Sequence, residues 1–182
     1  MKEQLEIERR WILIDSIDLE LFKGSSQKLN LTQFYLKNPE NKNERLRQII
    51  TEERQVSFIH TVKTPAAIGQ WEQESEITTE EYVEMLSRID SKRQVIIKDR
   101  YVFPFGQYKL EVDQFIIPVT YRILEIELPS LEVEISIPSF LGRAIEITKE
   151  KGLSNYRLSA DPKLFEKSIE NIINNYEMSS SH

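Results

Sequence analysis

Apolar and polar residues alternate with a period of two along most of the chain, which is the pattern of half-buried β-strands. A polar stretch at residues 38–43 has the composition of a hairpin loop. The chain is therefore predicted to consist mainly of strands. The predicted strands span residues 4–14, 28–37, 44–50, 54–63, 70–77, 94–104, 107–116, 121–129 and 143–148.

Two segments break the alternation and show helical spacing instead. Residues 78–81, Thr-Thr-Glu-Glu, resemble a capping box, and apolar residues then recur every three or four positions. Asp161 is followed by Pro162, which matches an N-cap before a proline at the first helical position. A shorter helix is predicted over residues 15–22. Because strands outnumber helices, the predicted fold class is α+β, with an antiparallel sheet or barrel at its centre.

The composition excludes several large classes of protein. The 182 residues contain no cysteine and only two histidines, which excludes disulfides, thiolate nucleophiles and Cys-ligated zinc. The five glycines are too scattered for a P-loop or a dinucleotide-binding fingerprint. The net charge of −6 argues against a nucleic-acid partner. No stretch approaches the ~20 apolar residues of a membrane helix, so no membrane partner is expected.

We expect a single domain over residues 1–177, because no Gly-, Ser- or Pro-rich linker divides the chain, and a disordered tail at 178–182. The first residues lack the apolar run of a signal peptide, so the cytoplasm is the expected compartment. The chemistry that remains for such a chain is that of carboxylates, lysines and arginines.

Charged residues occupy alternate positions in nearly every predicted strand, and alternate residues of a strand point to the same side. Stripes of this kind usually mark the solvated face of a sandwich. These stripes, however, are dense in Glu and Arg, and like charges follow one another, so they repel unless an opposite stripe or counter-ions compensate them. Closing the sheet with its charged faces inward would instead form a polar lumen. The stripes are Glu6, Glu8 and Arg10; Arg45 and Arg47; Glu72, Glu74 and Glu76; Lys98 and Arg100; Lys109, Glu111 and Asp113; and Glu125 and Glu127.

A lumen with both kinds of charge would suit a phosphate chain and its metal ion. Clustered carboxylates without Cys or His are hard oxygen ligands for Mg²⁺ or Mn²⁺. Arginine and lysine bind phosphate oxygens, arginine as a bidentate fork and lysine as a point charge. Phosphoryl transfer needs little beyond such positioning and charge neutralisation.

The stripes belong to short motifs that follow one another between residues 4 and 160. They are Glu6-Ile7-Glu8-Arg9-Arg10-Trp11, Gln33-Phe34-Tyr35-Leu36, Arg45-Leu46-Arg47, Thr61-Val62-Lys63, Glu72-Gln73-Glu74-Ser75-Glu76-Ile77, Lys98-Asp99-Arg100-Tyr101, Glu111-Val112-Asp113-Gln114-Phe115, Leu124-Glu125-Ile126-Glu127-Leu128, and Ile145-Glu146-Ile147-Thr148 with Leu153-Ser154-Asn155-Tyr156. Their order and spacing resemble the CYTH superfamily, the triphosphate tunnel metalloenzymes. A lone E-x-E motif has no specificity, whereas this ordered series covers almost the whole chain.

The resemblance implies a closed antiparallel β-barrel of about eight strands with peripheral helices, whose charges line a tunnel. It implies an enzyme that hydrolyses a small triphosphate, first of all inorganic tripolyphosphate, with Mg²⁺ or Mn²⁺ as cofactor. A class IV adenylyl cyclase or a thiamine triphosphatase on the same scaffold is the alternative. A non-catalytic module that binds polyphosphate or nucleotide is an alternative of another class. Homodimers are common in the superfamily, so a homodimer is the expected assembly.

The resemblance also implies roles for individual residues. The metal ligands would be Glu6, Glu8, Asp113, Glu125 and Glu127. The phosphate ligands would be Arg10, Arg45, Arg47, Lys63, Lys98 and Arg100. Residues expected to act in catalysis are Glu6, Glu8, Lys98 and Asp113. Weaker candidates for the site are Glu72, Glu74, Glu111, Ser154 and Asn155.

Two departures from the family pattern bear on these roles. Arg10 stands where the family usually has lysine, and an arginine stays charged and is a poor general base. The class IV cyclases carry a His-Phe pair before the first motif, and none precedes Glu6, which favours hydrolysis.

Trp71 has the opposite parity to Glu72 and is expected outside the lumen, so it offers no platform for a nucleobase.

Overall fold

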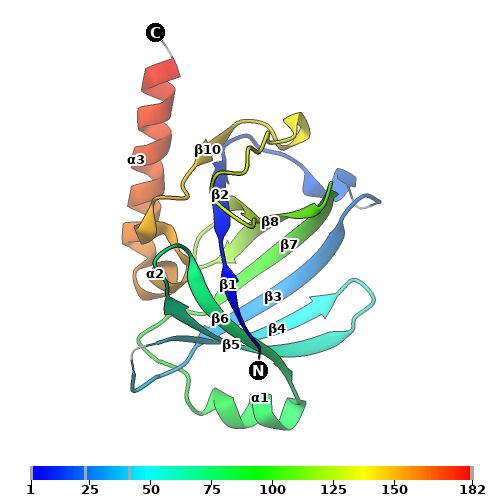
Figure 1. The fold of residues 1–182 in the computed structure, drawn as a ribbon, viewed down its shortest axis with the longest axis vertical. Coiled ribbons are helices and arrows are strands. Elements are labelled where there is room, and N and C mark those ends of the chain that lie inside the picture. The colour runs from blue at the N-terminus through cyan, green and yellow to red at the C-terminus, as the bar shows by residue number, and fades with distance from the viewer. Residues whose placement is uncertain (1, 23, 41, 181–182) are drawn as a thin grey trace.

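The computed structural model describes residues 2–22, 24–40 and 42–180, and its strands form one curved sheet (Figure 1). Neighbouring strands pair antiparallel in the order β1-β6-β5-β4-β3-β7-β8-β9-β2-β10. The α+β class is confirmed, and every predicted strand is present with ends close to those predicted. The strands are β1 (Lys2–Glu6), β2 (Glu8–Leu13), β3 (Gln27–Tyr35), β4 (Asn43–Thr51), β5 (Val56–Pro65), β6 (Gln70–Ile77), β7 (Ile96–Phe105), β8 (Tyr108–Ile117), β9 (Arg122–Glu127) and β10 (Ala144–Glu146).

The strand predicted over residues 4–14 is interrupted at Ile7, and this residue separates distant positions in the sheet. β1 pairs with β6, whereas β2 pairs with β9 and β10. The Ile7 side chain is buried, and its carbonyl oxygen accepts a hydrogen bond of 2.8 Å from Leu128 N. The strand order ends at β1 and β10, and no pairing among the described residues joins these two edges, so hydrogen bonds do not close the sheet and the predicted closed barrel is not confirmed. Among the described residues, the two strands β1 and β2 are linked only by the polypeptide chain, through Ile7.

The turn between β5 and β6 packs against this junction. Gly69 in that turn has a φ of +72°, and a Cβ added there would lie 2.1 Å from the carbonyl oxygen of Glu6. A left-handed backbone and a close approach to another segment both favour glycine. The distance between this turn and the end of β1 therefore depends on the absence of a side chain at Gly69.

The strand register gathers the predicted stripes on one side of the sheet, which we call the charged face. Directly opposed residues of antiparallel strands point to the same side. The stripes therefore share a surface although they come from segments far apart in the chain. Opposed pairs on this face are Glu8 with Glu127, Lys63 with Glu72, Arg100 with Asp113, and Glu111 with Glu125.

The other face of the sheet carries two apolar clusters. Trp11 and Leu124 belong to the first, which packs against Val133 in the connection between β9 and β10. Leu46 belongs to the second, which packs against Tyr82 of helix α1 (Thr79–Leu86). These clusters account for the apolar residues that alternate with the charges, since successive residues of a strand point to opposite faces.

The two predicted helices begin at the predicted caps. Thr78 caps α1, because its hydroxyl accepts a hydrogen bond of 3.2 Å from Glu81 N while the Glu81 carboxylate accepts one of 2.8 Å from Thr78 N. Asp161 caps α3 (Pro162–Ser180), and its carboxylate accepts a hydrogen bond of 3.0 Å from Leu164 N. The capping box and the Asp-Pro start are thus confirmed.

The tail and the shorter helical segments complete the fold. Helix α3 continues to Ser180, so residues 178–180 are helical where a disordered tail was predicted, and residues 181–182 lie outside the described residues. No helix in the described ranges combines the length and the apolar composition of a membrane-spanning segment. The remaining helical segments are α2 (Asn155–Ala160) and the 3-10 turns η2 (Ser139–Leu141) and η3 (Lys151–Leu153).

The helix predicted over residues 15–22 forms only as the 3-10 turn η1 (Leu19–Phe22). Asp15 instead binds a distant segment, since its carboxylate accepts hydrogen bonds of 2.7 Å from Arg143 N and 2.9 Å from Arg143 Nε. Helical periodicity is a local signal, and this contact spans more than a hundred residues of chain. The prediction for residues 15–18 was therefore wrong because a tertiary contact overrides it.

A third apolar cluster occupies one end of the charged face. Ile12, Tyr35 and Phe115 from the strands pack there against Leu158 of α2 and Phe165 of α3. Figure 1 shows α2 and α3 together along one side of the sheet. The C-terminal helices therefore cover this end of the charged face.

Candidate functional site

A cavity of about 1390 Å³ lies over the charged face. It unites the predicted site residues except Lys98 and Asp113, which are 1% and 0% exposed and lie buried beside Arg100. The predicted residues in its wall are Glu6, Glu8, Arg10, Arg45, Arg47, Lys63, Glu72, Glu74, Arg100, Glu111, Glu125, Glu127, Ser154 and Asn155.

One part of the wall, formed by β7, β8 and β9, contains cations that already have acidic partners. Arg100 donates hydrogen bonds of 2.6 and 2.7 Å to the two carboxylate oxygens of Asp113 and one of 2.8 Å to Glu125. It also pairs with Glu111, and Lys98 pairs with Asp113. We call Lys98, Arg100, Glu111, Asp113 and Glu125 the paired wall.

Electrostatics in the paired wall favour the charged form of its central carboxylate. Burial alone would raise the pKa of Asp113, but the charges of Arg100 and Lys98 outweigh it and hold that pKa well below its ordinary value. Burial lowers the pKa of Lys98, although Asp113 opposes this effect. Asp113 is thus an anion held between two cations.

A second part of the wall, Arg45 and Arg47 on β4, lacks this compensation, and we call it the open wall. The two residues are 8% and 9% exposed, and the buried Nε atom of each has no hydrogen-bond partner among the described residues. The nearest carboxylate of Arg45 is Glu72, at 3.8 Å. Burial, together with the charges of Arg45 and Arg100, lowers the pKa of Arg47 to about 10. Buried cations whose charge and donors are only partly satisfied are unfavourable unless an anion joins them.

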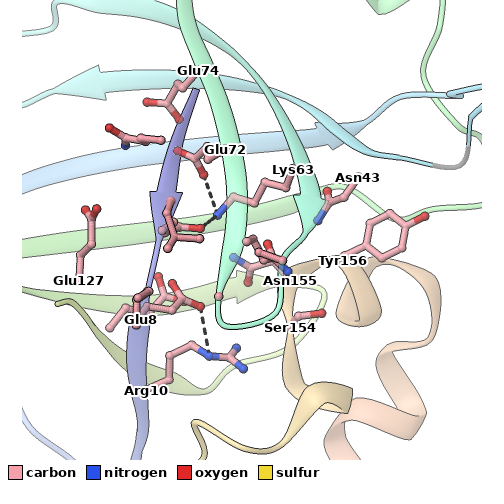
Figure 2. A pocket seen from close by; sticks show the side chains of 18 of the residues that line it. Glu8, Arg10, Asn43, Lys63, Glu72, Glu74, Glu127, Ser154, Asn155 and Tyr156 are labelled. Carbon is pink, nitrogen blue, oxygen red and sulfur yellow. Dashed lines mark hydrogen bonds and ion pairs between the residues drawn. The ribbon is translucent and has the colours of Figure 1, made fainter. Parts of the chain in front are cut away.

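Lys63 connects β5 with the end of β1. It forms an ion pair of 2.7 Å with Glu72 and a second pair with Glu6. Figure 2 shows its side chain extended toward Glu72. Burial would raise the pKa of Glu72, but the Lys63 ammonium lowers it below its ordinary value. Lys63 is therefore partly neutralised by carboxylates that a metal ion would otherwise attract.

The carboxylates of β1, β2 and β9 repel one another. Desolvation and the charges of Glu125 and Glu6 raise the pKa of Glu8 to about 7. Desolvation, Glu6 and Glu72 likewise raise the pKa of Glu127. The cation paired with Glu8 is Arg10, at 3.3 Å, a contact drawn in Figure 2. This side of the cavity is therefore short of positive charge.

The chemistry of these carboxylates fits a divalent metal ion. Mg²⁺ and Mn²⁺ prefer hard oxygen ligands, and a dication relieves repulsion among them. No three acidic side chains of the described residues converge into a finished metal site. Glu127 is exposed, and the Glu8 side chain keeps 35% of its exposure, so both have room to turn toward a shared ion.

Tyr35 and Tyr156 also line the cavity, although neither had an expected role beyond its place in a motif. Their rings meet edge to face at 5.2 Å. The Tyr35 hydroxyl accepts a hydrogen bond of 2.9 Å from Gln33 Nε2, and burial raises the pKa of Tyr35 to about 12. The alternation of the strand does place Tyr35 on the same side as Gln33, because the two residues are two positions apart. No local signal places Tyr156, since it reaches the cavity through the packing of α2.

Two further residues lie as the sequence suggested. Ser154 lines the cavity and also caps α2, because its hydroxyl accepts a hydrogen bond of 3.3 Å from Arg157 N. Trp71 pairs with Leu5 on the side of the sheet opposite to Glu72 and is 43% exposed. It therefore lies away from the charged face.

Comparison with known proteins identifies the fold. No protein-family model matches the chain, and no curated protein matches it in sequence. Solved structures of the same fold include the inorganic triphosphatase NE1496, 23% identical with a TM-score of 0.55 over 87% of this chain and 96% of that one. PH1819 from Pyrococcus horikoshii OT3 is 17% identical with a TM-score of 0.55, over 70% of this chain and 80% of its own.

A candidate adenylate cyclase from Vibrio parahaemolyticus is 18% identical with a TM-score of 0.51, over 71% of this chain and 78% of its own. At these identities the likeness shows the fold alone. The structures that share the fold include one named an inorganic triphosphatase and one described as a candidate adenylate cyclase.

Proposed function

We propose that the protein is a metal-dependent hydrolase of a small triphosphate, with inorganic tripolyphosphate as its preferred substrate. The observation that carries the proposal is the open wall. Arg45 and Arg47 are buried beside a large cavity, and their Nε atoms have no partner among the described residues. A phosphate chain would supply the acceptors that these guanidinium groups lack.

In this proposal the substrate lies along the charged face, with its phosphate oxygens on Arg45, Arg47 and Arg100. Donors that are fixed before the substrate arrives stabilise the charge that develops on the transferred phosphoryl group. Asp113, which the cavity does not reach and which also pairs with Lys98, holds Arg100 in position. The charged face would surround the chain as a tunnel, with its seam at the junction between β1 and β2.

The metal ion would be held by Glu6, Glu8, Glu125 and Glu127, four of the five ligands that the resemblance implies. The fifth, Asp113, is paired with Lys98 and Arg100 outside the cavity. When bound, Mg²⁺ or Mn²⁺ would neutralise phosphate oxygens and activate a water molecule. The raised pKa of Glu8 supports this assignment, since it reflects burial and a repulsion from Glu125 and Glu6 that Arg10 and Lys63 do not offset. Lys63, which now pairs with Glu6 and Glu72, would be freer to bind phosphate once the metal ion competes for Glu6.

The comparisons support the choice of substrate at the level of the fold. NE1496, which aligns over most of both chains, is named an inorganic triphosphatase. The cavity contacts identified above recognise phosphate oxygens, and Trp71 faces away from them. Tripolyphosphate therefore uses every interaction that the proposed site offers, whereas a nucleoside would add little.

The proposal is tested by measuring phosphate release from tripolyphosphate, ATP and thiamine triphosphate, each with Mg²⁺, with Mn²⁺ and with EDTA. We expect metal-dependent turnover with tripolyphosphate as the best substrate. Lys167→Gln, on the exposed side of α3, serves as a control that changes one charge away from the cavity. Faster conversion of ATP to cyclic AMP would favour the cyclase, and tight binding without turnover would favour a binding module.

A further inference from the structure

One end of the cavity is formed by Ser154, Asn155 and Tyr156, which we call the end wall. Figure 2 shows the three residues side by side where the chain enters α2. Leu153 before them and Leu158 after them belong to the apolar cluster that closes this end of the charged face. A ligand that extends along the face in this direction would meet the end wall.

Two arginines from other parts of the chain bind the backbone on both sides of the end wall. Arg10 of β2 donates a buried hydrogen bond of 2.7 Å from Nη1 to the carbonyl oxygen of Leu153. Arg93, between α1 and β7, donates from Nη1 to the carbonyl oxygen of Tyr156 at 2.7 Å and to Ser159 Oγ at 3.0 Å. Gln94 N also donates to the carbonyl oxygen of Ser159, at 2.8 Å.

The guanidinium group of Arg93 also stacks on the aromatic rings of the cavity. Its central carbon lies 3.6 Å from the centre of the Tyr156 ring and 5.5 Å from that of Tyr35. Tyr35 lies opposite Arg45 in the strand pairing. Arg93 therefore links the end wall to the open wall while its own charge is balanced by Asp90 at 3.4 Å. Lysine could not replace it, because only a planar group stacks and donates in this way.

We infer that Arg93, assisted by Arg10, is a positioning residue that fixes the end wall and thereby limits the length of the phosphate chain that the cavity accepts. The inference rests on the proposed function, since it concerns the same cavity. A rigid wall rejects a longer chain sterically, whereas a wall free to move away admits it. Neither arginine needs to touch the substrate for this effect.

The test compares wild-type protein, Arg93→Met and the control Lys92→Met, an exposed neighbour. KM and kcat are measured for tripolyphosphate and for tetrapolyphosphate. Wild type and control should prefer the shorter chain. In Arg93→Met we expect KM for tripolyphosphate to rise roughly tenfold with kcat nearly unchanged, because small displacements of binding groups are felt strongly. The ratio of kcat/KM for tetrapolyphosphate to that for tripolyphosphate should rise.

Thermal unfolding of each variant separates positioning from a general loss of stability. An unchanged chain-length ratio in folded Arg93→Met, or a wild type that does not discriminate between the two chains, would overturn the inference. If Arg93→Met does not fold, Ser159→Ala decides, because it removes one acceptor of Arg93 and one donor to the Tyr156 carbonyl oxygen without changing a residue of the end wall. The chain-length ratio should rise in this variant too, and an unchanged ratio would overturn the inference. Wild-type protein that neither hydrolyses nor is stabilised by tripolyphosphate would instead refute the proposed function.

Discussion

The paired wall and the open wall both contain buried cations, but they differ in whether the protein itself supplies the counter-ions. In the paired wall, Lys98 and Arg100 share Asp113, so the charges are balanced within the protein itself. In the open wall, Arg45 and Arg47 are equally buried, yet their Nε atoms have no partner among the described residues. A buried ion pair is a structural element whose loss destabilises the fold, whereas an unbalanced buried cation prepares the protein for an anion.

The largest expected effect comes from breaking the paired wall. Asp113→Asn keeps the shape of the side chain but leaves two buried cations without their shared anion. Removal of one partner of a buried pair typically costs about 3–5 kcal/mol. Urea unfolding should therefore show a large fall in the free energy of unfolding. A variant as stable as wild type would mean that Lys98 and Arg100 do not depend on Asp113.

Loss of one charge from the open wall should lower activity and leave stability intact, the reverse of the result expected for the paired wall. Arg47→Gln removes a donor to the transition state, and loss of one such donor lowers kcat by roughly 100-fold or more. The free protein should be at least as stable as wild type, because a repelling buried charge is gone. Activity and urea unfolding are measured on the same preparation. Full activity, or a marked loss of stability, would contradict the distinction between the walls.

Ligand binding should reveal the open wall without any chemistry. Tripolyphosphate at about 100 times its Kd should stabilise the folded wild type by about 2.7 kcal/mol, since it binds only the folded state. Thermal scans in EDTA with and without tripolyphosphate measure this rise in Tm. Arg47→Gln should lose most of the shift, and Lys167→Gln should keep it. An equal shift in all three proteins would place the anion elsewhere.

The smallest effect concerns the carboxylates opposite the open wall. Without metal, folded protein keeps a proton on Glu8 up to about pH 7, whereas the unfolded chain releases it near 4.5. Between these values the folded state binds more protons, so stability falls as pH rises. Glu8→Gln cannot ionise and should lack this part of the fall.

Urea unfolding in EDTA, at pH values below 4.5 and above about 7, tests the direction of this pH dependence. The stability of Glu8→Gln relative to wild type should increase as pH rises, and Mg²⁺ should restore the wild type at the upper pH. A relative stability that is independent of pH would contradict the raised pKa of Glu8 in the folded protein.

The extent of sequence-based prediction differs between these features for a physical reason. The strands and the shared face of Glu6, Glu8 and Arg10 follow from period-two alternation, which is local. The same alternation gives no sign of the break at Ile7, because Glu6 and Glu8 stay two positions apart across it and so share a face. Arg93 could not be assigned, since it meets the end wall only through tertiary packing, and Tyr156 was placed in a motif without a role. The roles of the charged residues remain predictions, although the cavity brings most of them together.

The single-residue junction at Ile7 restricts how the length of the chain can change. An insertion of one residue there would reverse the parity of β1 relative to β2, turning Glu6 to the outer side while Glu8 stayed inside. An insertion of two would restore parity but would move Glu6 along β6, away from Lys63. Gly69, pressed against the Glu6 carbonyl oxygen, leaves no room to absorb the extra chain. Insertions and deletions at this point should therefore be as damaging as the loss of a carboxylate.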